Sequence, residues 1–437
     1  MKTTIDETKI SLWILLFYTY LIWLRAIVLP PENIITPGLL LISLLLVLIG
    51  SGWKLHIGKS LLQTQSIAWI LILVLICIDN QDLIANLVNR GIIQYFVMIV
   101  FMLSCANNAT WTEKWIIWTK IYALIHACAT IFFYYFKNSY PLFANMAFSG
   151  VELQNVLRQF SYGWMPGICK NVSANGMILS ICLIVYAVSA MSKQKRSRIE
   201  LISIIVISFA LVLTCKRGPL LFVLISLSVV YLVNRRNKEA FVRILKLFAF
   251  ILIFILAVIV LSNYVPAIKN FILKSEELSN SNKGIFNGRQ GLWNLAIDMF
   301  KSSPLLGKGF GCFSEYAELY DAISNSAHNF YLQVLAELGL IGIFLYGIAF
   351  ISGVCINIKY IKIVQNEKDR TILSVALGVE MFTILYGLTS TSLMYYYILV
   401  PFFLACSASR AVVFQYERKS QSENADIILM ENRIVRY

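Results

Sequence analysis

The sequence predicts an all-α polytopic membrane protein with about twelve transmembrane helices and a small helical extracytoplasmic subdomain. Of its 437 residues, 59% are hydrophobic and only 14% are charged, whereas soluble domains carry roughly 25% charged residues. Apolar runs of about 20 residues recur along the whole chain, and each is long enough to cross a hydrocarbon core of about 30 Å. The alternating pattern of membrane β-barrels is not found, so helices are the predicted spanning structure.

The apolar runs define the spans in order along the chain. The first run begins at Ile10. It is too long for a cleavable signal peptide and lacks a small-residue cleavage site, so it is interpreted as a span. The twelve predicted spans are 10–29, 36–53, 61–78, 91–106, 115–136, 174–191, 199–214, 219–234, 244–264, 339–358, 371–387 and 393–414.

Basic residues in the short connections predict the orientation of the spans. Lysine and arginine cluster at 193–198, 235–246 and 359–370. With twelve spans these three connections and both termini fall on one side, which is therefore predicted to be cytoplasmic. A multi-pass membrane protein is the resulting expectation.

The same count places two longer polar segments, 137–173 and 265–337, on the outer side. The second is far longer than an ordinary connection, and such segments are usually functional or disordered. Helical spacing at 287–300 and at 329–338, separated by a glycine-rich turn region at 304–311, predicts a folded outer subdomain. The predicted domains are transmembrane helices 1–9 (1–264), the extracytoplasmic loop subdomain (265–338), transmembrane helices 10–12 (339–414) and a cytoplasmic tail (415–437).

Composition also limits the kinds of binding partner and metal site that are expected. The net charge of +14 belongs mostly to loops, where basic residues set topology and meet anionic membrane lipids, so no nucleic-acid partner is expected. The nine cysteines are scattered singly without metal-ligand or CxxC spacing. Neither a metal site nor a disulfide framework is therefore indicated.

Two arginines on the outer side are candidate anion ligands. Arg217 stands beside a Gly-Pro turn at the start of a span, where a guanidinium suits a phosphate or pyrophosphate group; the alternative is a snorkelling arginine that anchors the helix end. Arg289 opens the first helix of the outer subdomain. It is either a second cation on the same anion or a solvated surface residue.

His328 is the candidate catalytic residue. It is one of three histidines in the chain, and it lies at a predicted helix start close to the polar residues Asn329 and Tyr331. A neutral imidazole can take a proton from a hydroxyl group. The other two histidines, His56 and His126, are expected to be structural, and His126 is the ionisable residue noted within a span.

Three further residues are weaker candidates for supporting roles. Lys170 and Asn175 lie near the outer start of a span and could line a polar cavity. Glu337 is expected to be buried near the membrane, where an ionisable group is costly and often functional.

Taken together, these motifs resemble the conserved block of the O-antigen ligase and O-antigen (capsular, exopolysaccharide) polymerase superfamily. The turn TCKRG at 214–218 is similar to the short Ser-Arg-Gly turn of that superfamily, with Lys216 where a serine is common. The motifs of the block itself are RQGLW at 289–293, PLLGKGFG at 304–311, AHNFYL at 327–332 and ELGLIG at 337–342.

The resemblance implies a membrane glycosyltransferase of GT-C-type architecture that is inverting and independent of metal ions and other cofactors. The implied donor is a glycan on undecaprenyl pyrophosphate, used at the outer face of the plasma membrane. Arg217 and Arg289 would bind the pyrophosphate and His328 would activate the acceptor hydroxyl. Implied partners are a glycan or lipid-linked acceptor, membrane lipids and, as a further candidate, a chain-length regulator.

Several functions stay open at this stage. A polymerase adds the glycan to a second lipid-linked repeat unit, and the Ile/Asn/Lys-rich sequence and the altered turn favour this function. A ligase instead transfers the finished glycan to lipid A core or another acceptor. A flippase for lipid-linked oligosaccharide and a non-catalytic scaffold are the remaining alternatives; the lack of internal repeats and of several ionisable residues within spans argues against a flippase.

Overall fold

The computed structural model describes residues 53–78, 92–104, 111–192, 197–234, 289–320, 326–394 and 396–434, with a few further residues between 42 and 49 and Ala109. Within these ranges the chain forms helices and no strand, which confirms the helical class. The described helices are α3 (Leu61–Ile78), α5 (Ile92–Ser104), α6 (Thr112–Tyr135), α7 (Ser139–Ala147), α8 (Gly150–Ser161), α9 (Val172–Ser192), α10 (Arg198–Leu213), α11 (Arg217–Val233), α14 (Gln290–Ser302), α15 (Phe313–Leu319), α16 (Phe330–Ile363), α17 (Glu367–Tyr386), the 3-10 helix η3 (Ser392–Met394) and α18 (Tyr396–Ile434).

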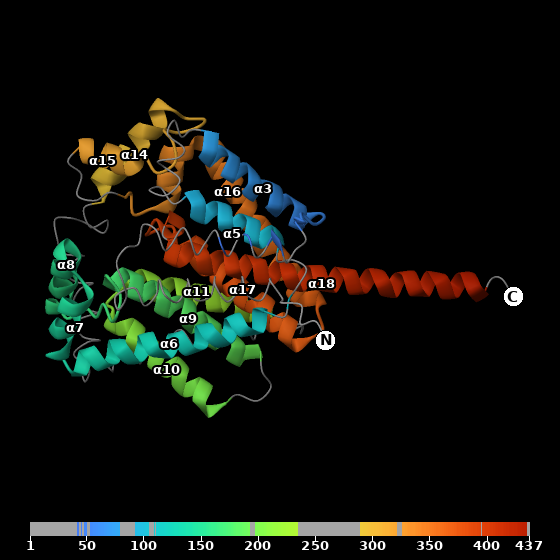
Figure 1. The fold of residues 1–437 in the computed structure, drawn as a ribbon, viewed down its shortest axis with the longest axis horizontal. Coiled ribbons are helices and arrows are strands. Elements are labelled where there is room, and N and C mark those ends of the chain that lie inside the picture. Colours follow the sequence, from blue (N-terminus) through green and yellow to red (C-terminus); the bar gives the residue numbers. More distant parts are fainter. Residues whose placement is uncertain are drawn as a thin grey trace.

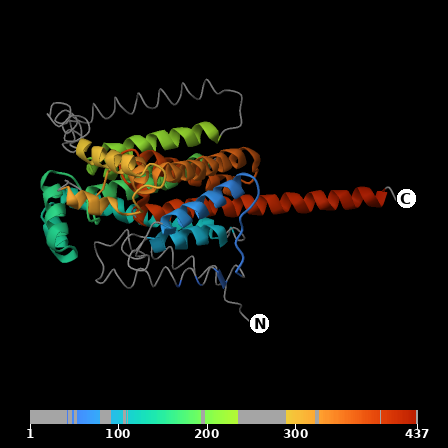
Figure 2. The same ribbon diagram turned by 90° about the horizontal axis from the view of Figure 1, so that it is seen from above.

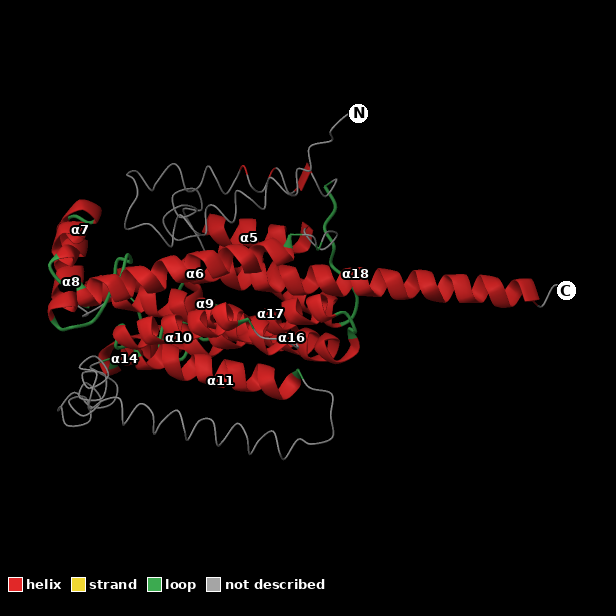
Figure 3. Ribbon diagram, turned by 90° about the horizontal axis from the view of Figure 1, so that it is seen from below, coloured by secondary structure: helices red, strands yellow, loops and turns green. Residues whose placement is uncertain are grey.

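Most of the long helices run side by side in one bundle (Figure 1). Helix α9 is buried along almost its whole length and packs on α6, α10, α11 and α17. Helix α18 packs on α17 and α5, and α16 packs on α3 and α17. Views from above and below place α5 and α11 on opposite flanks (Figures 2 and 3). The core of the bundle therefore lies along α9, α17 and the first part of α18.

The apolar helices match the expected spans closely. By length and composition, α3, α6, α9, α16 and the Ile398–Ser422 part of α18 can cross a membrane, and α5 and α11 are apolar but shorter. The described helices coincide with the spans predicted between 61 and 234 and between 339 and 414. The predicted spans 10–29 and 244–264, and nearly all of 36–53, lie outside the described residues. The chain is thus a helical, multi-pass membrane protein, and the total of twelve spans stays a prediction.

Short helices cover the end of the bundle where α6 ends and α9, α11 and α16 begin, which is called the site end below. Helices α7 and α8 lie across this end, nearly perpendicular to α6 (Figure 1). They occupy the polar segment 137–173, for which no helix was predicted. The buried ring of Tyr140 on α7 stacks on Phe160 of α8, with 4.4 Å between ring centroids. Helices α14 and α15 lie at the same end, and α14 matches the predicted helix at 287–300.

Helix α16 is broken at Gly339, whose backbone (φ 63°, ψ −160°) is not helical. This is the residue at which the sequence predicted one helix to end and a span to begin. A break of this kind releases nearby N–H and carbonyl groups from helical bonding, and each must find another partner because buried polar groups are costly when unpaired.

The segment 304–311 supplies those partners. The N–H groups of Leu340 and Ile341 donate to its first two carbonyls at 2.9 and 3.2 Å, and two of its own N–H groups donate to the carbonyls of the preceding turn of α16 at 3.0 and 2.9 Å. A Cβ atom on Gly307 would overlap the backbone of α16, and one on Gly339 would overlap the carbonyl of Leu305. The motifs PLLGKGFG and ELGLIG are therefore the two sides of one close backbone contact, which fastens the subdomain at the site end to the bundle.

The opposite end of the bundle is fastened by a buried arginine. Arg410 on α18 is 0% exposed. Its Nη1 donates to the carbonyl of Leu62 and to Gln65 Oε1 at 3.1 and 3.3 Å, and its Nη2 donates to the carbonyls of His56 and Ile57 at 2.7 and 3.2 Å. One guanidinium thus ties α18 to α3 and to the loop before it.

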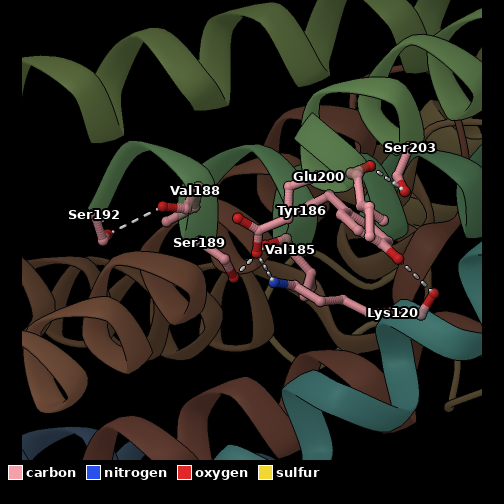
Figure 4. Close-up of polar contacts among 9 residues, drawn as sticks. Lys120, Val185, Tyr186, Val188, Ser189, Ser192, Glu200 and Ser203 are labelled. Atoms are coloured by element: carbon pink, nitrogen blue, oxygen red, sulfur yellow. Dashed lines mark hydrogen bonds and ion pairs between the residues drawn. The ribbon is translucent and has the colours of Figure 1, made fainter. Parts of the chain in front are cut away.

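Few ionisable residues besides His126 were expected within spans, and this expectation was wrong. The helices contain several more. Lys120 on α6 lies 3.1 Å from Glu200 at the start of α10, and the hydroxyl of Tyr186 on α9 donates to the carbonyl of Lys120 (Figure 4). Glu380 on α17 is buried like Arg410. The argument against a flippase that rested on a scarcity of such groups is therefore weakened.

Helix α18 continues without a break past the predicted boundary at 414 and ends at Ile434. It projects well beyond the other helices at the end opposite the site end (Figure 1). Most of the segment expected as a tail is thus helical.

Candidate functional site

The candidate site is built from four segments that lie far apart in the chain and meet at the site end. They are the turn before α11 with Lys216 and Arg217, the start of α14 with Arg289, the start of α16 with His328, and the loop after α17 at 387–392. The first three carry the residues predicted from the sequence. The fourth, called the 387–392 loop below, was not predicted.

The 387–392 loop holds two of the other segments by its backbone. The N–H of Phe330 donates to the carbonyls of Gly387 and Ser390 at 2.8 and 3.0 Å. Asn329 Nδ2 donates to the carbonyl of Leu388 at 3.2 Å. Arg289 Nη1 donates to the carbonyl of Thr389 at 3.0 Å. Four consecutive carbonyls of this loop thus fix the positions of Arg289 and of the residues next to His328.

His328 is held in an uncommon backbone conformation and an electropositive setting. Its φ of 51° lies in the left-handed region, which histidine visits more readily than most residues but which still costs free energy. Burial and, to a smaller extent, the positive charges of Arg289 and Lys216 together lower the pKa of His328 to about 4. The imidazole is therefore neutral at pH 7, and its electrostatic partners are the cations proposed from the sequence.

Arg217 begins helix α11 after a strained turn. The buried residue Cys215 has a φ of 53°, and such strain in a residue other than glycine is common at functional sites. Lys216 is the N-cap residue of α11, and its backbone is extended. A Cβ on Gly218 would lie 3.3 Å from Thr389 Oγ1, so the 387–392 loop also touches this segment. Arg217 and Lys216 are both partly exposed at the start of the helix, where backbone N–H groups favour an anion.

Arg289 caps helix α14, and the start of this helix is bonded to the His328 segment as well as to the 387–392 loop. Burial lowers the pKa of the Arg289 guanidinium from its usual value, although the nearby Tyr386 acts in the opposite direction. One turn into the helix, Trp293 Nε1 donates to the carbonyl of Ala327 at 3.1 Å. The indole thereby fixes the distance between α14 and the residue that precedes His328.

Glu337 lies at the centre of a buried hydrogen-bond network beneath the site. Its carboxylate is 0% exposed and accepts from the N–H groups of Gly311 and Phe313 at 2.9 and 3.3 Å and from Gln333 Nε2 at 3.0 Å. Gln333 Oε1 in turn accepts from the N–H of Ala327 at 3.2 Å. The expected burial of Glu337 is confirmed, and its contacts join the glycine-rich segment to the residue before His328.

The remaining predicted residues have identifiable contacts. Asn329 Oδ1 caps α16 by accepting from the N–H of Leu332 at 3.1 Å, and the hydroxyl of Tyr331 donates to the carbonyl of Ile384 at 2.7 Å. Both side chains therefore position α16 against the end of α17.

Lys170 and Asn175 make their contacts toward α6 and α8. Lys170 Nζ lies 4.0 Å from Glu152 Oε1. The amide of Asn175, which is 0% exposed, donates to Thr130 Oγ1 and to the carbonyl of Met165 at 3.0 and 3.1 Å. A polar cavity lined by these two residues stays a prediction.

The charges of the site define the ligand chemistry that it fits. Lys216, Arg217 and Arg289 bring three cationic side chains to the segments around a neutral imidazole, and guanidinium groups match phosphate oxygens geometrically. Among the described residues, no group of three His, Cys, Asp or Glu side chains is placed to hold a metal ion. The arrangement suits an anionic phosphate or pyrophosphate next to a group that can accept a proton.

Comparison with known families supports the resemblance seen in the sequence. A family model described as O-antigen ligase matches residues 201–347, a region that starts within α10 and ends within α16. The match covers less than half of the chain, yet it includes Arg217, Arg289 and His328 and supports the O-antigen ligase and polymerase superfamily inferred from the motifs. Among curated proteins, none matches this chain. The 387–392 loop lies outside the matched region.

Proposed function

We propose that this chain is a polysaccharide polymerase of the bacterial plasma membrane. It transfers a glycan from undecaprenyl pyrophosphate to a sugar hydroxyl of a second lipid-linked repeat unit, with inversion at the anomeric carbon and without a metal ion. The observation that carries the proposal is the neutral imidazole of His328, held beside the positive charges of Arg289 and Lys216. That pairing of a proton acceptor with cations is what a reaction with an anionic leaving group requires.

In the proposed step, the acceptor hydroxyl attacks the anomeric carbon from the face opposite the leaving group. The new glycosidic C–O bond forms while the bond from the anomeric carbon to the phosphate oxygen breaks, and undecaprenyl pyrophosphate leaves. His328 takes the hydroxyl proton. Arg217, Arg289 and Lys216 stabilise the negative charge that develops on the pyrophosphate, and preorganised cations in a partly desolvated site do this effectively.

The proposed orientation follows from the basic residues at the end opposite the site. The end of α16 carries Lys359 and Lys362, and the start of α17 carries Lys368 and Arg370. Basic residues close to the ends of spans favour the cytoplasmic side. The site end then faces the outside of the plasma membrane, where lipid-linked repeat units are joined, and both termini are cytoplasmic.

The second candidate function is ligation of the finished glycan to lipid A core or another acceptor. The description of the matching family as an O-antigen ligase favours it. Both reactions use the same donor groups and the same base, so they differ only in the acceptor.

A gel of lipid-linked glycans tests the proposal and separates the two reactions. Cells that lack the gene are complemented with the wild-type protein, His328→Ala, His328→Asn or the control His56→Asn. Asparagine is included because it tolerates the left-handed backbone of residue 328 while removing the base. His56 is a suitable control because it lies at the opposite end of the bundle, and its carbonyl, which accepts from Arg410 Nη2, is retained in asparagine.

A polymerase predicts that single repeat units accumulate on the lipid carrier in the knockout and in both His328 variants, whereas His56→Asn makes normal polymer. Full-length chains that accumulate on the carrier would identify a ligase instead. Normal polymer from correctly inserted His328→Asn protein would refute both functions as proposed here.

A further inference from the structure

The 387–392 loop has the sequence GLTSTS and carries four hydroxyl groups in succession. Three of them are turned inward, because Ser390, Thr391 and Ser392 are 7%, 1% and 1% exposed. Thr389 is exposed. Within this loop it is therefore the hydroxyl that a ligand at the site can reach.

Thr389 stands between the two proposed arginine positions. Its carbonyl accepts from Arg289 Nη1 at 3.0 Å. Its Oγ1 faces the first turn of α11, since a Cβ on Gly218, the residue after Arg217, would lie 3.3 Å from that oxygen. Thr389 therefore adjoins both segments that carry the proposed arginines.

The hydroxyl of Thr389 is weakly engaged within the protein. It donates to the carbonyl of Tyr386 at 3.4 Å, which is long for an O–H···O hydrogen bond. A charged phosphate oxygen is a stronger acceptor than a neutral carbonyl. The hydroxyl can thus exchange its long internal bond for a short bond to a bound phosphate.

We propose that Thr389 is a further pyrophosphate-binding residue, whose hydroxyl donates to a phosphate oxygen of the donor while its carbonyl orients the Arg289 guanidinium. The inference deepens the proposed function and rests on it. It also extends the donor site beyond the segment matched by the family model, because the loop is contributed by the end of α17.

The test compares full-length Thr389→Val, Thr389→Ser and Thr391→Val proteins, purified in lipid nanodiscs. Valine matches threonine in shape but has no hydroxyl, and serine retains the hydroxyl. Thr391→Val is the matched control, because Thr391 is buried two residues away and its hydroxyl has no hydrogen-bond partner among the described residues. Arg289→Ala serves as the reference for loss of the anion site.

The first readout is the binding of inorganic pyrophosphate and of undecaprenyl pyrophosphate, which does not depend on transfer. One hydrogen bond to a charged group corresponds to about tenfold or more in affinity. Thr389→Val should weaken both ligands by about that factor, while Thr389→Ser stays within about threefold of wild type and Thr391→Val is unchanged. The second readout is steady-state transfer, in which Thr389→Val should raise the donor KM more than it lowers kcat.

The outcomes distinguish the two proposals. If the wild-type protein binds pyrophosphate, Arg289→Ala weakens binding and Thr389→Val does not, then the role of Thr389 is wrong while the proposed function stands. If Thr389→Ser binds as poorly as Thr389→Val, the methyl group and not the hydroxyl matters, and the inference is again wrong. If neither ligand binds the wild-type protein, the proposed function itself fails.

Discussion

The contact between the break in α16 and the segment 304–311 yields a quantitative prediction for Gly339→Ala. The backbone at Gly339 has φ 63° and ψ −160°, a region that is essentially restricted to glycine and costs other residues about 1–3 kcal/mol. The new Cβ would also overlap the carbonyl of Leu305. That overlap is with backbone, so it cannot be relieved by a change of rotamer.

Relief requires the segment 304–311 to withdraw, which breaks the four backbone hydrogen bonds that join it to α16. Each such bond contributes about 1 kcal/mol net, so withdrawal costs about 4 kcal/mol. Gly339→Ala should therefore destabilise the protein by at least about 4 kcal/mol, because the backbone strain adds to the lost hydrogen bonds wherever residue 339 keeps its conformation. Activity should fall as well, because Gly311 of the same segment donates to Glu337. The hydrogen bonds of Glu337 extend through Gln333 to Ala327, the residue before His328.

The assay is the thermal midpoint of purified protein in detergent, together with the glycan gel on complemented cells. Gly347→Ala is the matched control: it lies on the same helix, and a Cβ there would meet nothing within 4 Å. Alanine is favoured over glycine in a helix by about 1 kcal/mol, so this control should be neutral or slightly stabilising. Equal thermal midpoints for Gly339→Ala and the wild type would refute the interlocked contact.

Three other predictions follow from the site and from the opposite end. The pKa of His328 is about 4 in the free protein, and a bound pyrophosphate should raise it by offsetting the charges of Arg289 and Lys216. In pH–rate profiles the acid limb of kcat should therefore lie at higher pH than that of kcat/KM. Glu337→Gln replaces an acceptor by a donor facing N–H groups and should lower the thermal midpoint, by an amount equivalent to about 2–3 kcal/mol. Arg410→Met removes the buried donor of four hydrogen bonds and should cost at least about 3 kcal/mol in denaturant unfolding.

Each of these predictions has a contrary outcome. Coincident acid limbs for kcat and kcat/KM would show that the donor does not lie beside His328. Lys216→Ala should move the acid limb of kcat/KM to higher pH, because it removes a positive charge that lowers the pKa of His328. Glu318→Gln, at an exposed carboxylate, should leave stability unchanged, and an equal loss in both glutamate variants would contradict the network. A fully stable Arg410→Met protein would show that α3 and α18 hold together without the guanidinium.

The class of protein and the chemistry of the candidate site were accessible from the sequence. Long apolar runs require helices because the hydrocarbon core leaves no water for backbone groups, and the predicted start of a span at 339 coincides with the break that the structure places at Gly339. The motifs singled out Arg217, Arg289 and His328 through their resemblance to a family. The residues that hold them were harder to find: Gln333 was overlooked because a glutamine within a helical pattern carries no distinctive signal.

The sequence by itself determined that the chain is a helical membrane protein and which side chains could bind an anion or take a proton. Those properties depend on local composition and on the chemistry of single residues. Only the tertiary structure decided that Thr389 and the loop around it join the site, and that Arg410 fastens the far end of the bundle. In both places the acceptors are mainly backbone carbonyls supplied by distant parts of the chain. Every residue has such a carbonyl, so no sequence pattern marks the ones that the fold will use.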